Sequence, residues 1–260
     1  MSPASPQRGN APAAAHALDI LGLIARRGEP VPAATITREL GLPRSTVYHL
    51  LSVLTDRGYL THLPDERRYG LGVAAYELGS AYQRQAPLQR LARGIVERLV
   101  DATGHNAHLA ILHGRDVLYV IEQRAPGRPL LVTDVGVRLP ATLTATGLAL
   151  LAGLPPAQVR ALFPTTHAFV QPDGRGVGSA GALRRELQQV RSRGYAVEDG
   201  LVTEGLNSVA VAAPDHTGHP VAALAVTYPG AEMPADEVDR VARIVGTFAR
   251  DLSRRLTGRL

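Results

Sequence analysis

The stretch that most constrains this chain is Pro43–Arg57, PRSTVYHLLSVLTDR. Its apolar residues recur at spacings of three and four, which places them on one side of a helix; they are Val47, Leu50, Leu51 and Leu54. The remaining circumference is polar and free to contact another molecule. Pro43 suits the first helical turn, and Gly58 predicts where the helix ends.

A second apolar repeat lies just upstream, in Ala33–Leu40, and only Gly41 and Leu42 separate the two segments. A Gly at that position can adopt the positive φ that ends one helix and turns the chain into the next. The pair therefore predicts a helix-turn-helix whose second helix enters a major groove. Its Arg, Ser and Thr cluster can contact phosphate or a guanine edge, and the candidate DNA contacts here are Thr35, Arg38, Arg44, Ser45 and Thr46. An ordinary amphipathic hairpin is the alternative.

The flanking segments complete a winged domain. His16–Arg27 predicts a third helix that buries the inner face of the pair. Gly58–Leu71 has two short strand-like segments around Pro64, Asp65 and Glu66, which predicts a β-hairpin. Arg67 and Arg68 lie near its tip, where they could contact a phosphate or the minor groove. A solvated turn, its charge offset by the neighbouring acids, is the alternative for both arginines.

The rest of the chain predicts a linker and a second domain. Gly72–Arg84 has helical spacing and is a candidate linker and dimer contact, with an extra helix of the first domain as the alternative. From Leu88 onward, paired strand signals alternate with helices, which predicts an α+β domain with one mainly antiparallel sheet. We expect a disordered tail at 1–12, a winged helix-turn-helix DNA-binding domain at 13–71, a linker helix at 72–87 and an effector-binding domain at 88–260.

Composition narrows the function classes. A chain of 260 residues that is 45% hydrophobic can form two globular domains, and it has no apolar run long enough for a membrane span. Its first residues lack the features of a secretory signal, so we expect a cytoplasmic protein. The absence of Cys excludes disulfides and thiolate metal sites. All basic residues are Arg, and the net charge of +5 is too mild to mark a nucleic-acid domain by itself.

An enzyme is the main competing interpretation. Two groups of residues could be proposed as metal ligands. The first is His105, His108 and His113, and the second is Asp215, His216 and His219. In the first group, His105 and His108 have opposite parity on a strand and would point to opposite faces. The second group lies in a predicted hairpin turn, where the requirements of the turn explain the residues. A hydrolase is no better supported, because no general base is indicated near the ThrAlaThrGly segment. We expect no enzymatic activity, no cofactor and no metal.

The order of the segments resembles the IclR family of bacterial transcriptional regulators, from about Ala14 to the last helix. The matching stretches in the first domain and linker are AlaLeuAspIleLeu (17–21), LeuGlyLeuProArgSerThrValTyrHisLeuLeu (40–51), ArgGlyTyrLeu (57–60), TyrGlyLeuGly (69–72) and GluLeuGlySer (77–80). Those in the second domain are HisLeuAlaIleLeu (108–112), LeuProAlaThrLeuThrAlaThrGlyLeuAlaLeuLeuAla (139–152), ArgGlyTyrAla (193–196) and ValAlaAlaLeuAlaVal (221–226).

The resemblance implies a winged helix-turn-helix, a linker helix and a GAF-like domain that binds a small effector, usually a carboxylate. By position, the groove-reading residues are Arg44, Ser45, Thr46, Tyr48 and His49, and His49 replaces a common Arg. The residues that would bound the effector cavity are Ala145, Thr146, Gly147, Asp199, Ser208, Ala225 and Thr227. Leu148 and Ala225 stand where the family often has a basic and a small polar residue, so we expect a larger or more apolar ligand than a simple keto acid.

Physical reasoning supports such a pocket. Thr146 and the amides around Gly147 begin a helix, and the start of a helix favours an anion. Ser208 and Thr227 add hydroxyls from neighbouring strands. The alternative is that these small residues only allow close packing of helix on sheet.

The sequence therefore predicts a DNA-binding transcriptional regulator, expected to repress, whose operator binding a small organic acid modulates. Its expected partners are double-stranded operator DNA, the effector, and further copies of itself as a homodimer or a dimer of dimers, without a membrane. A sensor that acts through a protein partner, with the helix-turn-helix used for dimerisation, is a further alternative. The polar start of the second helix argues against it.

Overall fold

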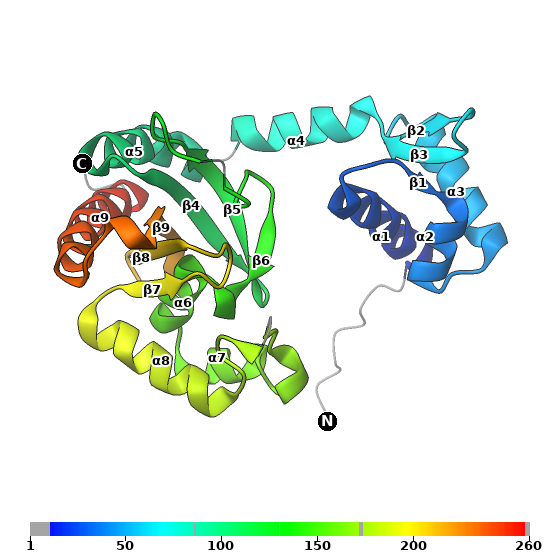
Figure 1. The fold of residues 1–260 in the computed structure, drawn as a ribbon. Coiled ribbons are helices and arrows are strands. Elements are labelled where there is room, and N and C mark those ends of the chain that lie inside the picture. Colours follow the sequence, from blue (N-terminus) through cyan, green and yellow to red (C-terminus); the bar gives the residue numbers. More distant parts are fainter. Residues whose placement is uncertain (1–10, 86, 130, 172–173, 258–260) are drawn as a thin grey trace, which may run out of the picture. The chain divides into compact units, whose positions relative to one another are not determined.

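The structure is a computed structural model that describes residues 11–85, 87–129, 131–171 and 174–257. The chain divides into two compact units, Met1–Ala86 and Pro87–Leu260, and Figure 1 shows the elements of each. Residues 1–10 of the expected tail lie outside the described residues. Pro12, which we placed in that tail, is instead the first residue of α1, because a proline fits the first helical turn.

Three helices form the core of the first unit. They are α1 (Pro12–Arg27), α2 (Ala33–Leu40) and α3 (Arg44–Asp56). The predicted apolar face of α3 is buried, and Ile20 of α1 and Ile36 of α2 pack into the same cluster. Gly41 has φ 63°, the left-handed conformation expected at the turn between α2 and α3. The helix-turn-helix is confirmed.

A small sheet forms the wing. Strands β2 (Leu60–Leu63) and β3 (Arg68–Leu71) pair antiparallel, as the hairpin prediction requires. A strand that we did not predict, β1 (Val31–Pro32), pairs with the other edge of β3. Helix α4 (Val73–Gln85) follows the wing and belongs to the first unit. Its start contacts the segment between α3 and β2, since the amide of Ala74 donates to the carbonyl of Gly58.

The second unit is built on a six-stranded sheet in the order β6-β5-β4-β9-β8-β7, and all its pairings are antiparallel. The strands are β4 (Asn106–His113), β5 (Asp116–Gln123), β6 (Arg138–Pro140), β7 (Ala196–Asp199), β8 (Leu206–Pro214) and β9 (Pro220–Pro229). The sequence predicted the four long strands and missed the two short edge strands, β6 and β7. The α+β fold with a mainly antiparallel sheet is confirmed.

Helices cover both faces of this sheet. One face packs against α5 (Pro87–Thr103) and α9 (Ala235–Leu256), and the other packs against α6 (Ala145–Gly153), α7 (Pro156–Leu162) and α8 (Ala180–Arg193). In β9, Leu224 and Val226 face the α5 and α9 layer, whereas Ala223 and Ala225 face α6. Because side chains alternate along a strand, Thr227 also lies on the α6 side.

Candidate functional site

The first turn of α3 presents a polar tip. Arg44, Ser45, Tyr48 and His49 are exposed and Thr46 is half-buried, while Val47 and Leu50 face the core. The guanidinium carbon of Arg44 lies 5.4 Å from the centroid of the Tyr48 ring. This cation–π contact directs the Arg44 side chain along the exposed face of the helix. The tip is therefore accessible within its own unit, as a helix that enters a groove requires.

The other candidate DNA contacts differ in the exposure of their side chains and in their hydrogen bonds within the protein. Arg38 is exposed near the end of α2, and Thr35 is half-buried in the same helix. Arg67 is exposed in the hairpin turn with φ 53°. Arg68 lies in β3 and donates from Nη1 to the carbonyl of Pro30 over 3.1 Å, which draws its side chain toward β1. Of the two wing arginines, Arg67 is the one placed to reach a phosphate.

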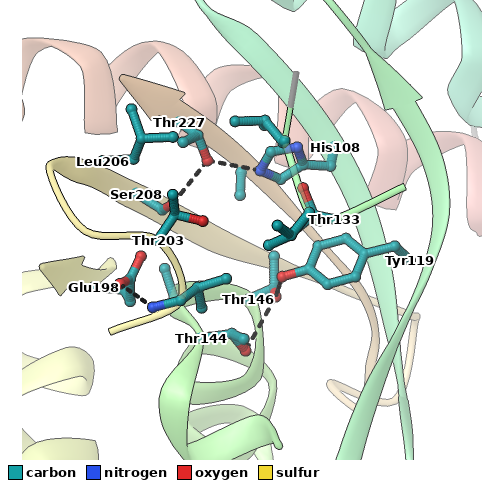
Figure 2. A pocket seen from close by; sticks show the side chains of 15 residues that line it. His108, Tyr119, Thr133, Thr144, Thr146, Glu198, Thr203, Leu206, Ser208 and Thr227 are labelled. Carbon is teal, nitrogen blue, oxygen red and sulfur yellow. Dashed lines mark hydrogen bonds between the residues drawn. The ribbon is translucent and has the colours of Figure 1, made fainter. Parts of the chain in front are cut away.

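The second unit contains a small cavity of about 20 Å³, partly open to solvent, between the start of α6 and the adjoining face of the sheet. Figure 2 shows its lining side chains. Five of the seven expected effector residues are among them: Ala145, Thr146, Ser208, Ala225 and Thr227. The cavity also takes residues that we did not predict there, namely His108, Tyr119, Leu131, Val132, Thr133, Thr144, Glu198, Val202, Thr203 and Leu206.

The strand register brings a row of polar groups to the cavity. Glu198 of β7 pairs with Ser208 of β8, and Ser208 pairs with Thr227 of β9. The Ser208 and Thr227 hydroxyls are 2.8 Å apart, and His108 Nε2 lies 2.9 Å from the Thr227 hydroxyl. The dashed lines in Figure 2 mark both contacts. Since these residues share a face of the sheet, neighbouring strands supply one continuous polar surface.

The start of α6 forms the opposite wall. The Thr144 hydroxyl accepts from the Gly147 amide over 3.0 Å and caps the helix. The amides of Ala145 and Thr146 belong to the first turn and have no partner within the helix. The Tyr119 hydroxyl lies 3.4 Å from the Thr146 hydroxyl, at the limit of hydrogen bonding. A helix start with free amides favours the binding of an anion or a carbonyl oxygen.

Two expected effector residues lie outside the lining, for different reasons. Asp199 is exposed, because strand alternation gives the cavity face of β7 to Glu198. Gly147 is buried behind the helix start, where an added Cβ would lie 2.1 Å from the carbonyl oxygen of Ala141. Its role is to let α6 approach the preceding turn. The interpretation that small residues serve close packing therefore fits Gly147.

Burial sets the charge state of the lining. It lowers the pKa of His108 to about 4, so this imidazole is neutral near pH 7. Burial also raises the pKa of the Glu198 carboxyl, although the amides of Val202 and Leu201 donate to it and partly offset that effect. Among the lining residues there is no Arg or Lys. An anionic ligand would thus depend on amides, hydroxyls and the protonation of Glu198.

Two buried polar atoms of the lining, His108 Nδ1 and Thr133 Oγ1, have no hydrogen-bond partner within the described residues. Buried polar groups in proteins are nearly always paired, so such exceptions call for an explanation. A ligand with its own polar groups, bound in this cavity, would supply one.

The metal hypothesis finds no support in the described part of the chain, where no group of three or more His, Asp or Glu is arranged to hold a metal ion. His105 precedes β4, His108 lines the cavity and His113 is exposed at the far end of the strand. The carboxylate of Asp215 accepts from the amides of Thr217 and His219, as expected of a residue that stabilises a turn. Nor is any helix of the described segments long and apolar enough to cross a membrane.

A helix-turn-helix with an exposed polar tip, joined in one chain to a domain with a cavity lined by polar groups, defines the class of ligand-responsive DNA-binding regulators. Comparisons with known proteins give the family. The model of the IclR helix-turn-helix domain matches residues 13–64, and that of the C-terminal domain of bacterial IclR transcriptional regulators matches residues 80–254. The chain belongs to the IclR family of bacterial transcriptional regulators, which are not enzymes.

Individual relatives agree with this assignment. The chain is 31% identical over 246 residues to the Pca regulon regulatory protein of Pseudomonas putida, covering 94% of this chain and 84% of that protein. It is 30% identical over 212 residues to the regulator XynR of Escherichia coli (strain K12), covering 82% and 84%. An IclR homolog from Microbacterium hydrocarbonoxydans, solved in complex with 4-hydroxybenzoate, has a similar fold, with a TM-score of 0.75, 23% identity and coverage of 94% and 98%.

Proposed function

We propose that this regulator represses transcription by binding an operator through the first turns of α3 in a homodimer, or in a dimer of dimers. A small organic acid that binds in the cavity at the start of α6 changes the affinity for the operator. The observation that carries the proposal is the cavity itself, with unpaired His108 Nδ1 and Thr133 Oγ1 in its buried lining. A regulator that binds operator DNA also belongs in the cytoplasm.

The chemistry of the cavity supports a particular kind of acid. The amides of Ala145 and Thr146 suit a carboxylate, and the opposite row with Ser208 and Thr227 suits a hydroxyl or carbonyl group. Apolar side chains, Leu131, Val132, Val202, Leu206 and Ala225, line much of the rest. We infer a hydroxy-substituted or otherwise bifunctional acid with an apolar body. The 4-hydroxybenzoate complex of the Microbacterium homolog involves an acid of this type.

Thermal-shift screening of aromatic and aliphatic hydroxy acids, followed by calorimetric titration of the hits, tests the effector site. Thr146→Val and Thr227→Val should each weaken the binding of an identified ligand by about 1 kcal/mol, because each removes a buried hydroxyl. Asp199→Asn is the matched control, since Asp199 is exposed outside the lining. Equal affinity of all three variants and the native chain would remove the ligand from this cavity.

Protonation of Glu198 gives an independent test of the same site. A bound carboxylate adds negative charge beside a carboxyl whose pKa is already raised, so binding should favour its protonated form. Acid affinity should then rise as the pH falls, with proton uptake in calorimetry. Glu198→Gln should abolish this proton uptake, and it should bind the acid with the affinity of the native protein whose Glu198 is protonated. Uptake that persists in Glu198→Gln would assign it to another group.

Operator binding is tested at Arg44. Arg44→Ala should weaken specific binding by about 1–3 kcal/mol if its fork contacts a base. Arg57→Ala, an exposed residue just after α3, is a control for simple loss of charge. Both are measured by gel shift at fixed salt on an operator selected from random sequence. Unchanged affinity for Arg44→Ala would count against its role at the DNA.

A further inference from the structure

The second unit has another cavity that the effector site does not use. It is a groove of about 350 Å³ between α7 and α8, with no lining residue in common with the cavity at α6. Its floor comes from Val159 and Phe163 on the α7 side and from Leu183 and Leu187 on α8. These side chains belong to the apolar core cluster, so the groove opens directly onto that core.

The sequence of α8 explains why the floor is apolar. Ala180, Leu183 and Leu187 recur at spacings of three and four and thus share one face of the helix. Helix α7 is only seven residues long, Pro156–Leu162, and covers this face incompletely. A helix rises about 1.5 Å per residue, so the apolar floor from Ala180 to Leu187 is roughly 10 Å long. That length suits a small molecule better than a docked helix, which needs several turns of contact.

The rim of the groove is cationic. Arg160, Arg184 and Arg191 all line it, and the lining contains no acidic residue. In the described part of the chain, none of these three guanidiniums lies in an ion pair. Arg191 is held in place, because its Nε donates to the Ala152 carbonyl over 2.7 Å. The rim therefore offers charge that the protein itself does not neutralise.

We propose that the groove between α7 and α8 is a second ligand site, which binds an amphipathic monocarboxylate with an aliphatic body of about eight carbons. The aliphatic chain of the ligand contacts Phe163, Leu183 and Leu187, and its carboxylate pairs with both Arg160 and Arg184 at the rim. A bare phosphate would leave the apolar floor exposed. A second copy of this face would bring like charges together, which disfavours a symmetric contact between copies.

Calorimetric titration of the full-length protein with octanoate tests the proposal. Octanoate should bind with saturation, whereas acetate, which lacks the apolar body, and octyltrimethylammonium, which has the opposite charge, should not. Arg160→Gln and Arg184→Gln should each weaken octanoate binding roughly three- to five-fold, as expected for partly exposed ion pairs. Arg185→Gln is the matched control, since Arg185 is exposed on the same helix but outside the lining.

Photocrosslinking locates the octanoate-binding site independently of the affinities. A diazirine analogue of octanoate should label peptides of 156–163 and 180–191, and Thr227→Val should leave that labelling unchanged. Labelling confined to strands β8 and β9 would place the acid in the effector cavity and overturn the proposal. Equal affinities of Arg184→Gln, Arg185→Gln and the native chain would overturn it as well, as would binding of octyltrimethylammonium with the affinity of octanoate.

Discussion

Arg44 and Tyr48 lie one helical turn apart at the start of α3, and their contact gives Tyr48 a positioning role for the arginine fork. Tyr48→Leu should weaken specific operator binding by about 0.5–1 kcal/mol, because an exposed cation–π contact of that size no longer orients Arg44. Tyr48→Phe keeps the ring and should behave like the native chain. Fluorescence anisotropy at fixed salt, on the selected operator, measures each.

A double-mutant cycle separates positioning from direct contact. If Tyr48 acts through Arg44, the Tyr48→Leu change should cost little when Arg44 is already Ala. Should Tyr48→Leu cost the same in both backgrounds, Tyr48 would contact DNA itself and its positioning role would be wrong.

His108 is a buried group whose ionisation affects the stability of the second unit. Its pKa is lowered to about 4 in the folded state, against 6.5 when exposed, so between these values the unfolded chain binds more protons. Stability should fall as the pH falls through this window, by about 2 kcal/mol between pH 7 and pH 5. Urea denaturation of this unit at the two pH values measures the loss.

His108→Gln removes the titrating group and should flatten this part of the pH dependence, although it lowers stability at pH 7. His113→Gln, an exposed residue at the end of the same strand, is the control and should keep the full slope. The raised pKa of Glu198 acts in the opposite direction, since its contribution is lost as the pH rises. An unchanged slope in His108→Gln would show that another group causes it.

At the scale of elements, the position of α6 depends on Gly147. A Cβ at this residue would lie 2.1 Å from the Ala141 carbonyl oxygen, so Gly147→Ala must displace backbone on one side. We expect a loss of about 1–3 kcal/mol in the unfolding free energy, typical of overpacking, together with weaker effector binding because the helix start moves. Calorimetric unfolding and ligand titration measure the two effects.

Gly94→Ala in α5 is the control, because the nearest atom to an added Cβ there is the end of the Arg98 side chain at 3.7 Å. In an open helical position this change should stabilise by up to about 1 kcal/mol. If Gly147→Ala were as stable as Gly94→Ala, the close approach of α6 to Ala141 would not constrain the site.

The elements that the sequence predicted are those with strong periodicity or clear end signals. The apolar repeat of α3 and the Gly at position 41 predicted the helix-turn-helix, and the turn sequence AspHisThrGly between two strand-like segments predicted the pair β8 and β9. The edge strands β1 and β6 have only two and three residues, too few to show a period, and the four-residue β7 was missed too. Their formation depends on an edge of a longer strand being available for pairing.

The effector cavity was predictable only in part, because it depends on register across strands distant in sequence. Ser208 and Thr227 were predicted, whereas Glu198 was passed over for its neighbour Asp199. The parity of β7 held the missing information: Glu198 is two residues after the buried Ala196 and so shares its face. His108 was considered only as a metal ligand, because the sequence does not reveal that it lies beside Thr227.

For the whole molecule, each unit contains its own site. The cavity is formed by the second unit alone, and the α3 tip by the first. In the proposed mechanism, the effector changes operator binding because it binds preferentially to one arrangement of the helix-turn-helix domains within an oligomer. Oligomerisation is therefore part of the mechanism. Helix α4 offers a surface for it: Val73 is 68% exposed and Tyr76 is 76% exposed, and their spacing places them on one face.

The combined variant Val73→Asp/Tyr76→Asp should therefore shift the proposed dimer toward monomer, because two carboxylates would enter an apolar contact. Affinity for an operator with two half-sites, spaced roughly 34 Å or a multiple of it, should fall at least about ten-fold, while binding to a single half-site persists. Effector binding should also persist, since the cavity needs only one chain.

Sedimentation equilibrium measures the oligomeric state, anisotropy on both DNAs measures operator affinity, and calorimetry measures effector binding. Glu77→Gln on the same helix is the control. A variant that stays dimeric would move the interface away from this face of α4, and one that becomes monomeric yet keeps full operator affinity would remove dimerisation from the mechanism.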